Sequence, residues 1–215
     1  MSSASLPSTS CEIEHATSRW RRAGRFLYLA NVTIEPETKN WTWVLERQCQ
    51  ECGFDTRPFP VEAIARLARE SARPWPALLA HPLVRVRPQE DCWSALEYGC
   101  HVRDVFRLGV HRVQRMLQED DPKFENWDQD RTAVAEHYEL QDPLVVGGEI
   151  TAAGSALAEL YDTVQTDQWQ RPGLRSDGSA FTIDSFGRYF LHDPMHHIFD
   201  VQRGFERLTS SLDTD

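Results

Sequence analysis

The stretch from Trp93 to Leu117, WSALEYGCHVRDVFRLGVHRVQRML, contains no proline and repeats apolar residues at intervals of three and four. This spacing places the apolar residues on one side of an α-helix, where they form a continuous stripe. The stripe consists of Tyr98, Val102, Val105, Phe106, Gly109, Val113, Met116 and Leu117. We therefore predict a long helix over residues 90–119, with this face packed against other helices.

Three further segments have the same helical period. One begins near Pro60 and is interrupted by Pro74 and Pro76. Another covers residues 142–169, where Asp142 and Pro143 resemble an N-cap and the first helical position. The last covers residues 183–208 and contains Pro194. Four long amphipathic segments without convincing alternating strands predict an all-α four-helix bundle.

The chain before the bundle has a different pattern. Residues 1–57 form a predicted irregular N-terminal arm, in which residues 26–32 could make a short strand, and the bundle covers residues 58–210. The arm contains Cys49 and Cys52, whose spacing is that of half a zinc knuckle or of a redox pair. A structural zinc would need two more ligands, for which we consider Cys11, His15 and Cys92. A redox role is less favoured, because no strand–helix–strand pattern surrounds the pair.

Composition limits the classes of partner and location. The chain has 215 residues, of which 40% are hydrophobic, which is enough for a sizeable core. Its formal net charge of −10 argues against a nucleic-acid or anionic-membrane partner. No apolar run approaches the roughly 20 residues that span a bilayer, and the first residues lack the features of a secretory signal. We therefore expect a cytoplasmic protein that acts on small molecules.

Histidines provide the strongest chemical signal. His101 lies on the inner side of the helix over residues 90–119, where it is either a hydrogen-bonded core residue or a metal ligand. In the last helix, His192 and His196 are four residues apart, and so are Asp193 and His197. A one-residue bulge at the proline between them would instead bring His192 and His197 to one face.

Each of these three arrangements has the same chemical meaning. Together with His101, it supplies three protein ligands to a divalent metal and leaves positions for water or substrate, as a catalytic metal site requires. The competing interpretation is a polar cluster on a kinked helix that binds no metal.

Two motifs resemble a known family. The run Trp93–His101, WSALEYGCH, resembles the tryptophan–serine start and the metal-binding histidine of helix two in the DinB/YfiT-like superfamily, which also contains mycothiol-dependent maleylpyruvate isomerases. The run His192–Asp200, HDPMHHIFD, resembles the superfamily's His-Glu-x-His-His element, with one residue more at Pro194 or Met195. A bulge there aligns His192 and His197 with the ligand pair. If the segment is instead aligned from Asp200, it resembles the Glu-x-x-x-His-x-x-Asp pattern of the isomerases, and the ligands are then Asp193 and His197.

The resemblance implies both a fold and a chemistry. It implies an up-down-down-up four-helix bundle, often a homodimer, that binds a divalent metal, with zinc expected and nickel as the alternative. The metal would lower the pKa of a low-molecular-weight thiol, mycothiol-like, which attacks an electrophilic substrate. The favoured ligands are His101, His192 and His197, with His196 in reserve, and Glu97 and Asp104 are candidates to orient His101.

This chemistry predicts a thiol S-transferase or isomerase. Two alternatives remain open at the level of sequence. One is a non-catalytic, stress-associated metal-binding bundle, and the other is a metal-dependent hydrolase in which water is the nucleophile.

Overall fold

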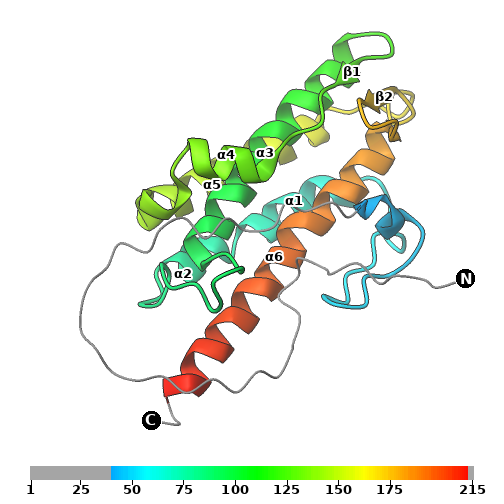
Figure 1. The fold of residues 1–215 in the computed structure, drawn as a ribbon. Helices are drawn as coiled ribbons and strands as arrows, with labels where there is room; N and C mark the ends of the chain where they lie inside the picture. Colours follow the sequence, from blue (N-terminus) through cyan, green and yellow to red (C-terminus); the bar gives the residue numbers. More distant parts are fainter. Residues whose placement is uncertain (1–39, 213–215) are drawn as a thin grey trace, which may run out of the picture.

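Helices make up most of the described chain, which is residues 40–212 of this computed structural model (Figure 1). The first predicted helix is divided into α1 (Ala63–Ala72) and α2 (Trp75–Leu79), because the prolines at 74 and 76 interrupt it. The other three long helices are α3 (Ala95–Gln118), α5 (Pro143–Asp162) and α6 (Ile183–Leu212). The connections contain the short helix α4 (Gln129–Ala135) and the 3-10 turns η1 (Trp41–Leu45) and η2 (Tyr138–Leu140).

Local signals in the sequence set where two of these helices begin. Ser94 and Glu97 form a reciprocal capping box at the start of α3, each side chain accepting a hydrogen bond from the other's backbone N–H. Asp142 caps α5 by accepting from two backbone N–H groups, and Pro143 occupies the first turn, as predicted. The capping box fixes the register of α3, so His101 is held two turns into the helix.

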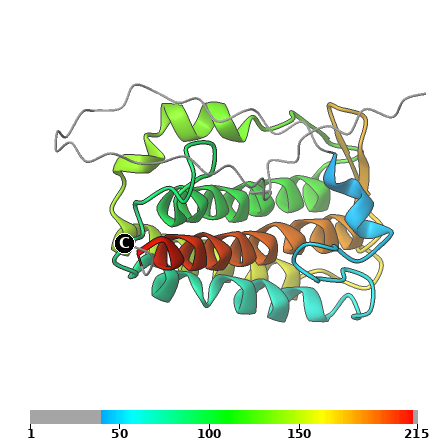
Figure 2. The same cartoon turned by 60° about the horizontal axis from the view of Figure 1, so that its bottom comes forward.

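The helices are arranged in the predicted topology. α5 packs against α1 and α3, and α6 packs against the same two helices, so the order around the bundle is α1, α5, α3, α6. α3 and α5 both end at one end of the bundle, where α6 begins, and the Arg188 side chain near the start of α6 bonds the Phe59 carbonyl just before α1. α1 and α6 therefore run in one direction and α3 and α5 in the other (Figure 2). This up-down-down-up order confirms the expected fold class.

A small three-stranded sheet closes that same end. β1 (Lys123–Phe124) pairs in parallel with β2 (Pro172–Arg175), and β2 pairs antiparallel with β3 (Ala180–Thr182) through a turn at Gly178, whose φ is +90°. The sequence pattern predicted no strand here, because strands of two to four residues are too short to reveal an alternating pattern. The sheet joins the chain after α3 to the chain before α6.

The described part of the N-terminal arm lies against α6 (Figure 1). The Arg188 guanidinium donates hydrogen bonds to the backbone carbonyls of Thr56, Arg57 and Phe59. The predicted strand over residues 26–32 lies outside the described residues. The arm from residue 40 onward is thus fastened along the first half of α6.

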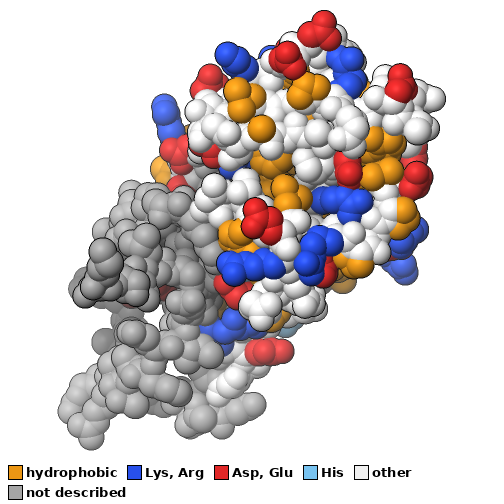
Figure 3. Space-filling model, turned by 90° about the vertical axis from the view of Figure 1, so that its right-hand side faces the viewer, with side chains coloured by type: hydrophobic (Ala, Val, Ile, Leu, Met, Phe, Trp, Pro, Cys, Tyr) orange, Lys and Arg blue, Asp and Glu red, His pale blue; other side chains and the backbone are white. Residues whose placement is uncertain are grey.

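The surface of the described residues mixes charges of both signs. Seen from the right-hand side of Figure 1, acidic and basic side chains are interspersed with small apolar patches (Figure 3). None of the helices within residues 40–212 combines the length and the hydropathy needed to cross a bilayer.

Replacement of Gly154 by alanine tests the close contact between α1 and α5. A Cβ atom at Gly154 would lie 2.5 Å from the Cβ of Ala72 on α1, and no side-chain rotation relieves a clash between two Cβ atoms. We expect Gly154→Ala to lower the free energy of unfolding by about 1–3 kcal/mol. Gly148→Ala in the same helix is the control, since nothing lies within 4 Å of its Cβ, and alanine there should be neutral or stabilise by up to about 1 kcal/mol. Urea unfolding followed by circular dichroism measures both, and equal stabilities would contradict this packing.

Candidate metal centres

The regular winding of α6 separates its four potential metal ligands into two pairs. The helix continues without interruption through Pro194, so each residue turns by about 100° from the one before it. His192 and His196 consequently point to one side, and Asp193 and His197 point to the next. Each pair meets different residues, and two groups of potential ligands result.

The first group, the His–Asp cluster, consists of His101 from α3 with Asp193 and His197 from α6. One ligand atom from each lies within 4.8 Å of the others. His101 Nε2 is 3.3 Å from Asp193 Oδ1, and His197 Nε2 is 3.8 Å from the same oxygen. The cluster thus bridges two antiparallel helices in the middle of the bundle.

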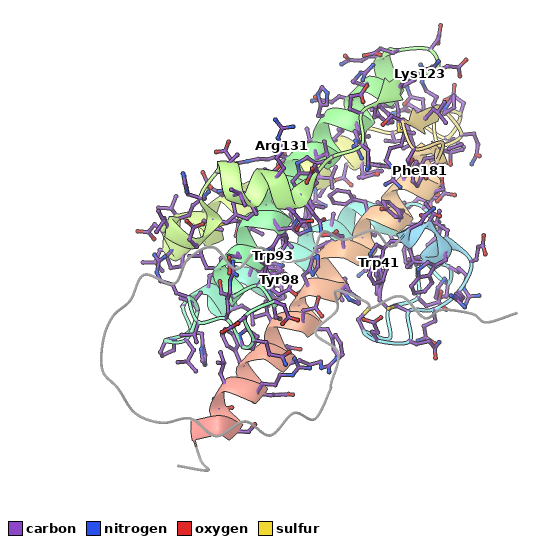
Figure 4. All side chains as sticks on the ribbon, in the orientation of Figure 1. Trp41, Trp93, Tyr98, Lys123, Arg131 and Phe181 are labelled. Carbon is purple, nitrogen blue, oxygen red and sulfur yellow. The ribbon has the colours of Figure 1, made fainter. Side chains whose placement is uncertain are left out.

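Aromatic side chains surround the His–Asp cluster. The Trp127 ring stacks on the His101 ring at 5.3 Å with an 8° interplanar angle, and Trp93 contacts His101 at 5.4 Å. Tyr98 covers His197 at 4.9 Å. Trp93 and Tyr98 lie at the beginning of α3, on the side that faces α6 (Figure 4). These rings hold the imidazoles in place and keep water from most of their surface.

The donor set and its unsatisfied atoms fit a divalent cation. His101 is completely buried and turns its Nε2 toward the Asp193 carboxylate, and Asp193 Oδ1 is a buried atom without a hydrogen-bond partner. Burial raises the pKa of the Asp193 carboxyl, but the nearby charges of His101 and His197 outweigh this and hold its pKa below the ordinary value. An ionised, buried carboxylate oxygen without a hydrogen bond is costly unless a cation neutralises it. Two imidazoles and one carboxylate are ligands that zinc takes in catalytic sites.

A cavity of about 510 Å³ opens beside this cluster. Its wall includes His101 and Asp193, together with aromatic rings from the N-terminal arm, the α3–α4 connection and α6. The aromatic residues are Trp41, Trp127, Phe186, Tyr189 and Phe190. The volume lies in the range of sites for small molecules and cofactors.

Two buried arginines line the same cavity. Arg175 pairs with the Asp177 carboxylate at 2.8 Å and also donates to the hydroxyl of Tyr189. Arg112, 6% exposed, donates to the carbonyl of Glu125 and lies over the ring of Phe124, and neither contact supplies a negative charge. Burial and the charge of Arg175 lower the pKa of Arg112 to about 10, so Arg112 remains cationic at neutral pH.

The second group, the Cys–His cluster, consists of Cys49, Cys52, His192 and His196. Their ligand atoms also lie within 4.8 Å of one another. Cys49 Sγ is 3.7 Å from His196 Nδ1, and Cys52 Sγ is 3.7 Å from His192 Nε2. Burial raises the pKa of the Cys52 thiol to about 12 and lowers the pKa of His192 to about 3. The imidazole is therefore in the neutral form that binds metals, while the thiol needs a cation to ionise.

Carboxylates lie against the outer nitrogens of both clusters. Asp200 Oδ2 is 3.0 Å from His197 Nδ1 in the His–Asp cluster and 3.7 Å from His196 Nε2 in the Cys–His cluster. Glu51 Oε2 is 3.5 Å from His196 Nε2. A carboxylate on the far nitrogen of a ligating histidine fixes the ring orientation and its tautomer.

The structure divides the ligands that the sequence suggested for a single site. His101 lies together with Asp193 and His197, and these last two are the pair selected by the alignment from Asp200. His192, a favoured ligand, and His196, the reserve, lie in the Cys–His cluster instead. The physical reason is that α6 absorbs the proline without a bulge, so His192 and His197 stay about 140° apart around the helix.

The partners of the CxxC pair were not found from the sequence. Cys11 and His15 lie outside the described residues, and Cys92 is not part of the cluster. The actual neighbours, His192 and His196, are 140 and 147 positions away from the cysteines they face. Their four-residue spacing was a visible signal, but only the packing of the arm on α6 shows which residues they meet.

The two acids proposed to orient His101 have other partners. Glu97 caps the start of α3 and pairs with Arg87. Asp104 pairs with Arg103 and accepts a hydrogen bond from the Tyr138 hydroxyl. The carboxylate that contacts a histidine of the His–Asp cluster from outside is that of Asp200.

Comparison with known proteins bears on the fold. No family model matches the sequence, and no curated protein matches it. A solved structure, YfiT from Bacillus subtilis, superposes with a TM-score of 0.56 at 15% sequence identity, covering 81% of this chain and 93% of YfiT. This chain has the YfiT fold. The YfiT structure is described as "a probable metal-dependent hydrolase with an unusual four-helix bundle topology".

Replacement of His101 tests whether the His–Asp cluster binds a metal. We expect His101→Gln to remove one equivalent of divalent metal per chain, because only two of the three ligands remain. His111→Gln is the matched control, since this exposed histidine lies on the same helix and outside both clusters. Elemental analysis after loading with zinc and desalting measures the metal, and circular dichroism checks the helix content. The assignment would be wrong if His101→Gln kept the full metal content of the wild type.

Proposed function

We propose that this chain is a metal-dependent enzyme in which a low-molecular-weight thiol attacks an electrophilic substrate. The observation that carries the proposal is the position of the His–Asp cluster. Its three potential ligands lie beside a cavity of about 510 Å³, so a bound ion would keep coordination positions open toward a ligand. Zinc is the expected metal, and nickel is the alternative.

The chemistry needs both the metal and the residues around it. A divalent metal held by His101, Asp193 and His197 would supply the positive charge that lowers the pKa of a nucleophile and makes its anion available at neutral pH. Asp200 orients His197 from its far nitrogen. Trp127 stacks on His101 and, together with Trp41, forms part of the aromatic wall of the cavity.

The choice of a thiol rests on three residues that α6 contributes. Asp193, His197 and Asp200 have the spacing that resembles the Glu-x-x-x-His-x-x-Asp pattern of the mycothiol-dependent isomerases. The same three residues are joined by contacts in the structure, with Asp200 behind His197. This agreement supports a thiol such as mycothiol as the nucleophile.

Hydrolysis is the second candidate function, and the fold favours it. YfiT, whose fold this chain shares, is described as a probable metal-dependent hydrolase. Two histidines and a carboxylate also activate water in zinc hydrolases. The two functions use the same residues and differ in the nucleophile, so they can be separated by experiment.

The arginines in the cavity suggest the class of substrate. Arg112 and Arg175 are the two arginines of a wall that also contains Asp128, Asp130, Asp177 and Asp193. Arg112 donates a hydrogen bond to a backbone carbonyl, and its charge interacts with those of both Arg175 and Asp177. Guanidinium groups bind carboxylates and phosphates through charge-assisted hydrogen bonds. We therefore propose that the electrophile carries an acidic group, which these arginines hold while its reactive carbon faces the His–Asp cluster.

The proposed nucleophile is tested by thiol binding and by product identity. Calorimetry with mycothiol and with cysteine should show binding to zinc-loaded wild type and to His111→Gln, and none to His101→Gln. With chloronitrobenzoate as the electrophile, the thiol sulfur replaces chlorine, so the products are the aryl thioether, chloride and a proton. Formation of hydroxynitrobenzoate in place of the thioether would favour the hydrolase. Absence of metal-dependent thiol binding would exclude the thiol proposal.

Arg112→Gln tests the acidic substrate. It should raise the KM for chloronitrobenzoate and lower kcat/KM by about 10- to 100-fold, because a hydrogen bond to a charged group contributes about 1.5–3 kcal/mol. The neutral chloronitrobenzamide should be affected little, and Arg131→Gln is the control, since this exposed arginine is not part of the cavity wall. An equal loss of kcat/KM for both electrophiles would contradict this role of Arg112.

A further inference from the structure

We propose that Cys49, Cys52, His192 and His196 form a second metal site, a closed zinc centre that fastens the N-terminal arm to α6. This site is separate from the His–Asp cluster and has a different task. The proposal does not depend on the proposed activity, because a closed centre has no open position for a substrate.

The chemistry of the four side chains carries the proposal. Two sulfurs and two imidazole nitrogens are the ligand set of structural zinc sites, and these side chains contribute the spacings C-x2-C and H-x3-H. In a tetrahedral site, bond lengths of about 2.3 Å to sulfur and 2.0–2.1 Å to nitrogen place these atoms about 3.6 Å apart. Two of the four sulfur–nitrogen distances in the Cys–His cluster are 3.7 Å, and all four ligand atoms lie within 4.8 Å of one another. The cluster therefore needs little rearrangement to surround one ion.

The surroundings of the cluster match those of a structural centre. Cys49, His192 and His196 are buried, and Cys52 is half-buried. The Trp41 ring contacts both imidazoles, tilted against His192 at 5.2 Å and edge-on to His196 at 5.0 Å. The indole covers the site from one side and limits the access of water.

The orientation of His196 gives a second, independent indication. Its Nδ1 points to Cys49, while its Nε2 lies near the carboxylates of Glu51 and Asp200, at 3.5 and 3.7 Å. This is the arrangement of a metal-ligating histidine, in which one ring nitrogen binds the ion and the other is held by a carboxylate. Packing of a histidine in the core does not by itself require a thiol near one ring nitrogen and carboxylates near the other.

The position of the centre indicates what it does. The cysteines follow η1 in the arm, and the histidines lie on the turn of α6 that also carries Asp193 and His197. Trp41, which lies beside α6 in Figure 4, contacts the Cys–His cluster and also lines the cavity. An ion bound by the four side chains would thus fix this wall of the cavity and the adjacent turn of α6 at the same time.

A redox pair is the competing interpretation of the two cysteines. A Cys49–Cys52 disulfide would remove both thiolates and leave the histidines without sulfur ligands. The structure has both thiols free, each facing an imidazole. The experiment therefore includes the oxidation state of this pair as an outcome.

The test begins with the metal content of matched variants loaded with zinc and desalted. Wild type should contain two equivalents per chain, and Cys49→Ser/Cys52→Ser should contain one. Cys100→Ser is the control, because it replaces a buried thiol of α3 that belongs to neither cluster, and it should keep both ions. His101→Gln should lose the other equivalent and keep this one. If the double serine variant bound as much zinc as wild type, the proposal would be overturned.

Cobalt substitution identifies the ligands directly. Thiolate ligands give cobalt(II) an intense charge-transfer absorption that histidine and carboxylate ligands do not give. We expect this band in wild type, in His101→Gln and in Cys100→Ser, and its loss in Cys49→Ser/Cys52→Ser. Its absence from wild type with bound cobalt would show that the cysteines are not ligands.

Alkylation of the wild type keeps the proposal testable if the double variant does not fold. In zinc-loaded protein, iodoacetamide should leave Cys49 and Cys52 unmodified until a strong chelator removes the metal, after which both should react. Peptide mass spectrometry reads each site. Labelling that is indifferent to the chelator, or a Cys49–Cys52 disulfide in freshly purified protein, would overturn the proposal.

Discussion

Both clusters depend on the unbroken winding of α6. Over the six residues from 192 to 197, the helix presents two pairs of ligands at four-residue spacing, and the pairs differ in direction by about 100°. One pair meets the arm and the other meets α3. Pro194 removes one backbone donor from this turn, and the helix continues through it without a break. A bulge at this position would lie inside both pairs, so it would turn His196 and His197 relative to His192 and Asp193 and break up each pair.

The close approach of α3 and α6 completes the His–Asp cluster. Gly109 allows this contact, since a Cβ atom there would lie 2.7 Å from the Phe190 ring. Asp193 lies one turn after Phe190 on α6, and His101 lies two turns before Gly109 on α3. Because the two helices run antiparallel, their contact brings these two side chains together. The helices contribute His101 on one side and Asp193 and His197 on the other, within rigid secondary structure. Ligands carried by helices keep their geometry better than ligands carried by loops.

The two clusters differ in the way that structural and catalytic sites differ. The Cys–His cluster has four potential ligands, no carboxylate among them, and an indole in contact with it. The His–Asp cluster has three ligands and a cavity beside it. Asp200 contacts a histidine of each, so one carboxylate orients both sites. In this arrangement the N-terminal arm supports the His–Asp cluster in two ways. It contributes Trp41 to the cavity wall, and it packs against the turn of α6 that carries Asp193 and His197.

The helices could be predicted from the sequence, and their topology could be predicted from the family resemblance. The same resemblance directed attention to His101 and to the segment from His192 to His197. Helical periodicity and capping residues such as Ser94 and Asp142 are local signals, and local signals can be read from neighbouring residues. The tertiary structure alone decided how the histidines are shared between two groups, because that depends on whether Pro194 causes a bulge and on where a distant arm packs. It also decided that Cys49 and Cys52 meet His192 and His196 across some 140 positions, a contact for which no periodicity in the sequence gives a signal.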